Sequence, residues 1–109
     1  MALRTATQRR ELCRDCPIAR VADALGDPCS LLIIRDLIDE PRRFSELEES
    51  LGMSTRTLTL TLRRLQKQGI VSRHERKTLP LYVQYRITRK GAAFGAVVDA
   101  MRSYGKKYL

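Results

Sequence analysis

The sequence lacks tryptophan and has one histidine and three cysteines among 109 residues. With one histidine, no glycine-rich phosphate loop and no nucleophile motif, no set of catalytic groups converges, so we expect that the protein is not an enzyme. An odd, small number of cysteines favours reduced thiols over a disulfide framework. No apolar run approaches the ~18 residues that span a bilayer, and no apolar stretch follows the first charges. We therefore expect a cytoplasmic protein with no membrane partner.

Metal ligands are equally scarce. Cys13 and Cys16 have the spacing of half a zinc site, but structural zinc needs four ligands. Only Cys29 and His74 remain, and His74 belongs to a distant predicted hairpin. We predict no metal and no cofactor.

Positive charge is what the chain has in excess, with a formal net charge of +9. Residues 54–77 carry seven Lys or Arg against one acid, whereas residues 31–53 carry six acids against three bases. A segregated basic surface favours a polyanionic partner, nucleic acid above all. A chain of this length forms one domain, which excludes a cleft between domains.

Two helices are predicted in the first third of the chain. Residues 1–15 are polar and basic, so we expect a flexible arm followed by a single domain over residues 16–109. Pro17 suits the first position of one helix, and Asp27 can cap the next. That second helix is apolar nearly all round over residues 31–38, which predicts the centre of the core.

Residues 44–68 have the pattern of two short helices joined by a tight turn. Ser45 and Glu48 fit a capping box at the start of the first helix. Gly52 can take the left-handed conformation that ends a helix, and Ser54 can cap the second one. The pattern predicts a helix-turn-helix.

The second of these helices alternates Thr and Leu over residues 57–62, which is also the pattern of a strand. We predict a helix, because the leucines recur at helical spacing and good helix formers follow up to Gln68. Its opposite face is cationic, as the major groove of DNA would require. The residues expected to contact DNA from this helix are Ser54, Arg56, Thr57, Thr59, Leu60, Arg63 and Lys67.

Residues 70–87 predict a hairpin whose tip contains proline. The second strand alternates, with Leu81, Val83, Tyr85 and Ile87 on one face. A helix-turn-helix followed by a basic hairpin predicts a winged helix, a mainly helical α+β fold. The wing residues expected to contact phosphates or the minor groove are Arg73, Arg76 and Lys77.

A last helix is predicted over residues 89–108, capped by Thr88. About 20 helical residues extend ~30 Å, beyond a small core. We therefore favour a dimerisation helix, with packing on its own core as the alternative. The apolar stripe consists of Phe94, Val97, Val98, Met101, Tyr104 and Tyr108.

Several motifs in one order resemble the HxlR-type winged helix-turn-helix transcriptional regulators. They are Cys16-Pro17-Ile18, Leu25-Gly26-Asp27, residues 31–37, residues 41–47, Gly69-Ile70-Val71, residues 85–88 and Lys90-Gly91. The resemblance implies a homodimer joined through terminal helices, with both winged helices on a palindromic operator. Cys29 stands where the family commonly has tryptophan, so a small thiol replaces a large aromatic side chain in the core. Leu60-Thr61 stand where the family often has a polar or basic pair, so its usual base preference does not carry over.

Cys16 is a candidate thiol sensor, because the positive end of the helix that follows it favours a reactive thiolate. Some members of the family this chain resembles sense oxidants or electrophiles through a cysteine at this place. Cys13 or Cys29 would then resolve the oxidised product. The alternative is that Cys16 packs as a small apolar side chain.

A small basic protein that binds RNA, or any nucleic acid without specificity, is the alternative function. Single-strand binders stack bases on exposed aromatic rings, and here only Tyr82 is expected to be neither buried nor part of an interface. The sequence does not define the operator, the regulated genes, the effector or the sign of regulation.

Overall fold

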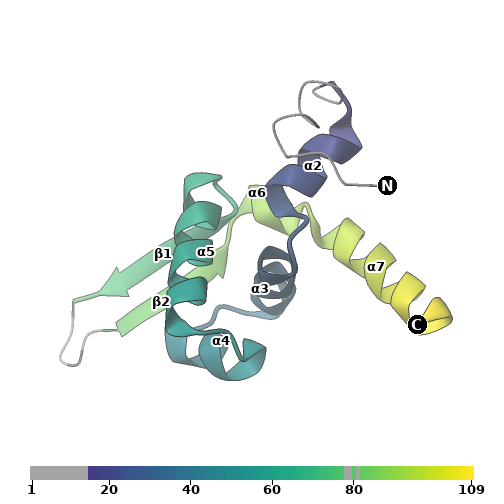
Figure 1. The fold of residues 1–109 in the computed structure, drawn as a ribbon. Coiled ribbons are helices and arrows are strands. Elements are labelled where there is room, and N and C mark those ends of the chain that lie inside the picture. Colours follow the sequence, from purple (N-terminus) through teal and green to yellow (C-terminus); the bar gives the residue numbers. More distant parts are fainter. Residues whose placement is uncertain (1–14, 78–79, 81) are drawn as a thin grey trace.

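The computed structural model describes residues 15–77, 80 and 82–109 (Figure 1). Almost all of the predicted basic arm, including Cys13, lies outside these residues, as does Leu81. The elements follow in the order α2 (Pro17–Leu25), α3 (Pro28–Asp39), α4 (Phe44–Leu51), α5 (Thr55–Lys67), β1 (Val71–Arg76), β2 (Tyr82–Ile87), α6 (Arg89–Ala92) and α7 (Gly95–Tyr108). The predicted fold class, mainly helical α+β with a winged helix-turn-helix, is confirmed.

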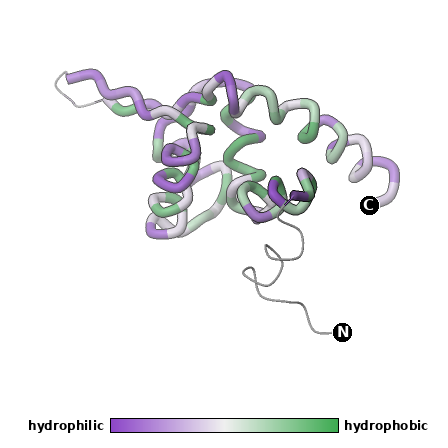
Figure 2. The backbone as a smooth tube through the Cα atoms, turned by 90° about the horizontal axis from the view of Figure 1, so that it is seen from above, coloured by the Kyte–Doolittle hydropathy of each residue, from purple (hydrophilic) through white to green (hydrophobic). Residues whose placement is uncertain are grey.

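Helix α3 forms the centre of the core, as predicted. Ile33, Ile34 and Leu37 are at most 1% exposed, and α4, α5, α7 and β2 all contact this helix. Asp27 caps it by accepting a hydrogen bond from the Ser30 amide at 3.0 Å. Figure 2 shows the apolar positions gathered in the middle of the molecule, while much of the hairpin is hydrophilic.

Helix α2 begins after Cys16 and ends at Gly26, as the sequence predicts. It points away from the rest of the molecule in Figure 1. Leu25 is buried, whereas Ile18 is 81% exposed and Val21 44%. An outer apolar surface of α2 is therefore left uncovered in the single chain.

The turn between α4 and α5 has the predicted geometry. Gly52 takes a left-handed conformation with φ of 62°, which suits glycine because it has no Cβ. Ser54 caps α5, since its hydroxyl accepts a hydrogen bond from the Thr57 amide at 3.1 Å. The predicted helix-turn-helix is thus confirmed.

The start of α4 differs from the prediction. The helix begins at Phe44 and not after Ser45, because Arg43 is the N-cap residue and the Glu46 carboxylate accepts from its amide at 2.9 Å. Glu48, expected in the capping box, instead accepts from the hydroxyl of Thr55 at 2.7 Å. This bond ties α4 to the first residue of α5.

The alternating Thr-Leu segment is a helix. Thr59 and Thr61 donate hydrogen bonds from their hydroxyls to the carbonyls of Thr55 and Thr57, each at 2.7 Å. Bonds of this kind satisfy a threonine hydroxyl inside a helix. Thr61 lies on the buried face of the helix with Leu58, Leu62 and Leu65, which are at most 1% exposed.

The predicted hairpin is confirmed, with an antiparallel register that runs from Val71 opposite Ile87 to Arg76 opposite Tyr82. Arg42 adds one pair at the edge of β2. Its amide donates to the Tyr85 carbonyl at 3.0 Å, and the Tyr85 amide donates to the Arg42 carbonyl at 2.7 Å. This pair fixes the start of α4 beside the second strand of the wing.

The structure divides the predicted C-terminal helix into α6 and α7, with a turn at Ala93 and Phe94 between them. Thr88 caps α6 as expected, accepting from the Gly91 amide at 3.0 Å. A Cβ on Gly91 would clash with the Ile70 carbonyl oxygen, so only glycine allows α6 this close to the chain before β1. Because α7 alone has 14 residues, it extends ~21 Å, less than the single helix expected.

Candidate nucleic-acid interface

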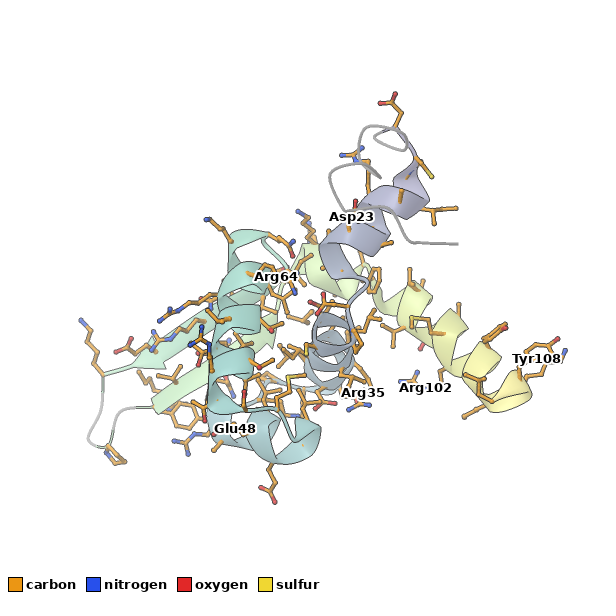
Figure 3. The ribbon with its side chains drawn as sticks, in the orientation of Figure 1. Asp23, Arg35, Glu48, Arg64, Arg102 and Tyr108 are labelled. Carbon is orange, nitrogen blue, oxygen red and sulfur yellow. The ribbon has the colours of Figure 1, made fainter. Side chains whose placement is uncertain are left out.

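The face of α5 opposite its buried leucines is open to solvent (Figure 3). Arg56, Arg63 and Lys67 are exposed, and Leu60 is 52% exposed between them. Among the described residues, no side-chain hydrogen bond or ion pair involves these three cations. This helix therefore presents cations without internal partners together with one exposed apolar side chain.

The other α5 residues that the sequence selected make local hydrogen bonds. Ser54 donates to the Thr57 hydroxyl at 3.0 Å in addition to capping the helix. Thr59 is half-buried and uses its hydroxyl within the helix. These residues fix the conformation of the first turn, while the arginines stay open to a ligand.

Arg64 has a structural task. It donates to the Ala24 carbonyl at 2.9 Å, to the Asp27 carboxylate at 3.0 Å and to the Ser30 hydroxyl. Burial alone would raise the pKa of Asp27, but hydrogen bonds from Ser30 and the charge of Arg64 hold this pKa below its usual value. Helix α5 is thereby fastened to the junction of α2 and α3.

The three predicted wing cations have different surroundings. Arg73 lies opposite Tyr85 and pairs with Glu75 at 2.9 Å, and its hydrogen bonds to Glu75 and Tyr85 raise the pKa of Arg73. Arg76 pairs with Tyr82 in the register, on the other face of the hairpin. Lys77 follows β1 and is exposed. Because Arg73 pairs with Glu75, the two predicted wing cations that are left without an ion pair in the described chain are Arg76 and Lys77.

Arg43 belongs to this surface, although it was not among the residues selected from the sequence. Its guanidinium carbon lies 4.6 Å from the centre of the Tyr82 ring, and that of Arg76 lies 4.8 Å from the same centre. The only sequence signal was the pair Arg42-Arg43 directly before the helix-turn-helix. The contact itself depends on folding, because Arg43 and Tyr82 are far apart in the chain.

The predicted interface stripe on α7 splits into two groups. Phe94 and Val98 pack against the core of their own chain. The exposed group is formed by Val97 (42%), Met101 (48%), Tyr104 (62%) and Tyr108 (63%). The rings of Tyr104 and Tyr108 lie 5.1 Å apart. The outer half of α7 therefore keeps an apolar surface in the single chain.

The two described cysteines are free thiols. Cys16 is half-buried at the N-cap of α2 and makes no side-chain capping bond, and Cys29 is half-buried in the first turn of α3. His74 is exposed on β1, where its Nε2 lies 2.8 Å from the Ser72 hydroxyl. Within the described part of the chain, no three potential metal ligands lie together.

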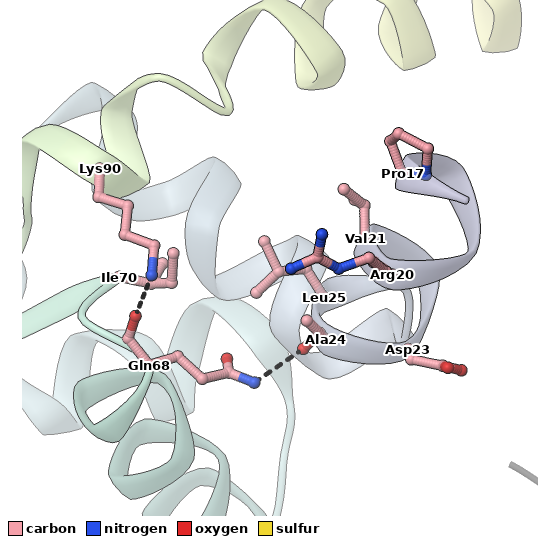
Figure 4. Close-up of a pocket in the computed structure, with 9 residues that line it drawn as sticks. All are labelled: Pro17, Arg20, Val21, Asp23, Ala24, Leu25, Gln68, Ile70 and Lys90. Carbon is pink, nitrogen blue, oxygen red and sulfur yellow. Dashed lines mark hydrogen bonds between the residues drawn. The ribbon is translucent and has the colours of Figure 1, made fainter. Parts of the chain in front are cut away.

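An open pocket of about 810 Å³ lies between α2 and the end of α5 (Figure 4). Gln68 donates to the Ala24 carbonyl at 3.3 Å, and Lys90 donates to the Gln68 carbonyl at 2.8 Å. Val21, Leu25 and Ile70 supply much of the apolar wall. The pocket borders the same α2 surface that the single chain leaves uncovered.

A helix-turn-helix with an exposed second helix, followed by a cationic hairpin, defines the class of winged helix-turn-helix proteins. Within the described residues, no helix is long and apolar enough to cross a membrane.

The family model described as HxlR-like helix-turn-helix matches residues 24–109, so the chain belongs to that family. It is 39% identical over 95 residues to the HTH-type transcriptional regulator sll1512 of Synechocystis sp., covering 86% of this chain and 70% of that protein. This chain is also similar to a solved structure, the redox regulator HypR in its oxidised form. The TM-score is 0.80 and the identity 29%, over 86% of this chain and 98% of HypR. Another similar structure is the reduced form of the transcriptional regulator YodB from B. subtilis, with a TM-score of 0.74, 34% identity and coverage of 85% and 93%. The protein is a transcriptional regulator with a helix-turn-helix fold.

Proposed function

We propose that the protein is a cytoplasmic regulator that binds double-stranded DNA with sequence specificity as a homodimer. The observation that carries the proposal is the outer face of α5, where Arg56, Arg63 and Lys67 are exposed without internal partners beside Leu60. A helix of this kind fits the major groove, where arginine takes guanine edges bidentately and an apolar side chain meets a thymine methyl. Arg76 and Lys77 of the wing add contacts to phosphates.

A homodimer is supported by two apolar surfaces that the single chain leaves open. One is the outer side of α2 with Ile18 and Val21, and the other is the outer half of α7 with Met101 and Tyr104. Two recognition helices on one face of DNA must be ~34 Å apart, which a stiff interface between terminal helices provides. We assign the exposed α7 residues to this interface.

Selection of bound sequences from random duplex DNA tests the proposal. We expect a palindromic consensus with half-sites about one helical turn apart. A variant in which Arg56, Arg63 and Lys67 are all replaced by glutamine serves as control and should enrich no consensus. If the wild type enriches no sequence, the non-specific alternative is supported instead. If it binds single-stranded RNA more tightly than duplex DNA, the RNA-binding alternative is supported.

A thiol switch at Cys16 is the regulatory part of the proposal. Cys16 is a free, half-buried thiol at the start of α2, and HypR, a protein with a similar fold, is a redox regulator. A peroxide would oxidise the thiol to a sulfenic acid with release of water, and a second thiol would then form a disulfide with release of another water. Cys13 or Cys29 supplies the second thiol, whereas a quinone would add directly to the sulfur. Either product changes the position of α2 and hence the spacing of the recognition helices.

The comparison that tests the switch is DNA affinity before and after mild peroxide or quinone treatment. We expect the wild type to change its affinity and Cys16→Ser to keep it under either reagent. Cys13→Ser and Cys29→Ser identify the second thiol, because the variant that lacks it forms no disulfide with peroxide but still reacts with quinone at Cys16. A wild type that binds unchanged with all of its thiols modified would exclude the switch while leaving DNA binding intact.

A further inference from the structure

Two guanidinium groups share one aromatic ring at the outer end of the two wing strands. Arg43 lies 4.6 Å and Arg76 4.8 Å from the centre of the Tyr82 ring. Both arginines are exposed, and Tyr82 is half-buried. The negative faces of an aromatic ring attract cations, but two cations at one ring also repel each other. An anion that contacts both guanidiniums would remove this repulsion.

Backbone pairing fixes the positions of the three residues. Arg76 and Tyr82 are register partners in the antiparallel hairpin, so their side chains share a face. Arg42 forms a two-hydrogen-bond pair with Tyr85, which places Arg43 beside β2. The cluster therefore joins three segments of chain: the start of α4 and the two strand ends that flank the wing tip.

The neighbouring carboxylates are already engaged elsewhere. Glu40 pairs with Arg42 at 3.3 Å, and Glu75 pairs with Arg73 at 2.9 Å. Glu46 accepts from the backbone amide of Arg43 at 2.9 Å. In the described part of the chain, no ion pair joins a carboxylate to the guanidinium of Arg43 or Arg76. An external anion would meet both groups without displacing an internal one.

We infer that Arg43, Tyr82 and Arg76 form a clamp for one phosphodiester group of the DNA backbone. The two arginines bind the phosphate, and Tyr82 is a positioning residue that holds the guanidiniums together. A planar guanidinium matches a phosphate in shape as well as in charge. The inference rests on the proposed DNA binding and adds Arg43, which lies where α4 begins, to the phosphate contacts proposed for the wing.

Salt dependence of DNA binding tests the arginines. Arg43→Gln should lower affinity for the selected duplex and for an unrelated duplex by a similar factor, ~5-fold at physiological salt. The slope of log affinity against log salt, measured from about 50 to about 200 mM, should flatten by about one ion. Lys106→Gln on α7 is the control, because it removes one positive charge far from the wing and should keep the wild-type slope.

A second pair of variants tests the ring. Tyr82→Phe keeps the aromatic face and should bind within about twofold of the wild type, whereas Tyr82→Leu should weaken binding about as much as Arg43→Gln. Unfolding midpoints show whether each variant is folded. If Tyr82→Leu does not fold, Arg43→Gln still tests the clamp, because Arg43 is exposed and its replacement leaves the core intact.

Duplexes in which one phosphate at a time is replaced by a neutral methylphosphonate identify the phosphate that the clamp binds. At the clamped position, the neutral group should weaken wild-type binding but leave Arg43→Gln binding unchanged. If wild type binds the duplex and no position depends on Arg43, or if Arg43→Gln keeps the wild-type slope, the clamp is wrong and DNA binding stands. A wild type that binds no duplex at low salt overturns both.

Discussion

Arg63 and Arg64 are neighbours in sequence with opposite tasks. Arg63 is exposed on α5 without a partner in the described chain, whereas Arg64 bonds to Ala24, Asp27 and Ser30. Helical geometry separates them, since consecutive residues point about 100° apart. Composition alone counts both as basic residues, so the sequence did not reveal the structural role of Arg64.

This difference gives a matched pair of substitutions. Arg64→Ala should lower the free energy of unfolding by ~1–3 kcal/mol, because it removes charge-assisted hydrogen bonds and leaves half-buried acceptors without donors. Arg63→Ala should change stability by less than ~0.5 kcal/mol but weaken DNA binding. Chemical denaturation and DNA titration of both variants check this, and equal stability losses would contradict it.

Arg56 should contribute to base recognition. Arg56→Ala is expected to cost ~1–3 kcal/mol of binding to the selected duplex and to relax the consensus at one position per half-site. Arg102→Ala on α7, paired only with Asp99, is the control and should preserve the consensus. An unchanged consensus and affinity would remove Arg56 from the base-contacting set.

Asp27 should make stability depend on pH. Its pKa is lowered in the folded protein, so its charged form stabilises the fold at pH values above the unfolded value of ~3.9, and this contribution is lost as pH falls through the folded pKa. Asp27→Asn keeps a capping side chain but removes the charge. We expect this variant to have a lower unfolding midpoint at neutral pH and to approach the wild type below about pH 4. A difference that stays constant from pH 7 to pH 3 would contradict the assignment.

At the scale of elements, most helix and strand boundaries followed from local signals. Pro17, Asp27, Gly52 and Ser54 each have the backbone role that their residue type predicts. The start of α4 does not follow from local signals. Pairing of Arg42 with Tyr85 keeps the chain extended there, and the helix begins two residues later, at Phe44. Sequence spacing cannot show such a pair between distant segments.

The C-terminal helix was mispredicted in length for a similar reason. Gly91 packs against the Ile70 carbonyl and the Ile87 side chain, contacts that no local pattern encodes. The same limit applied to the candidate site, where helical periodicity identified the exposed face of α5 but not Arg43 over Tyr82.

The α4–α5 turn should be sensitive to its glycine. Gly52 has φ of +62°, and nothing lies within 4 Å of the position that a Cβ would take, so Gly52→Ala introduces backbone strain without a clash. We expect a loss of ~1–2 kcal/mol in unfolding free energy. Gly105→Ala, at a helical glycine that is equally open, should instead gain up to ~1 kcal/mol. Thermal unfolding of the two variants checks the contrast, and a neutral Gly52→Ala would contradict it.

At the scale of the whole molecule, α2 and α7 both extend from the core with apolar residues exposed (Figure 1). Helix α7 is shorter than the single helix from which a dimer interface is predicted. Met101 and Tyr104 on it are nevertheless exposed. The exposed apolar surface now supports the interface more directly than helix length does.

Replacing Met101 and Tyr104 with glutamate should therefore yield folded monomers that bind the palindrome weakly. Sedimentation equilibrium and DNA titration check the two effects. The control variant has glutamate in place of Lys106 and Lys107, which introduces the same number of acids on α7. It should form more dimer than the variant changed at Met101 and Tyr104. A wild type that sediments as a monomer at micromolar concentration would contradict the homodimer.

The alternating Thr-Leu segment has a consequence for the unfolded chain. Residues 57–62 contain no charge and keep the two-residue period of a strand, so chains without a core expose a short segment suited to cross-β stacking. Arg56 precedes this segment and Arg63-Arg64 follow it, and flanking charges of this kind oppose aggregation. Arg56 and Arg63, which are proposed to meet DNA, thus also oppose aggregation of newly made protein. The yield of soluble protein is therefore measured for the variant that neutralises both, before its DNA binding is compared with that of the wild type.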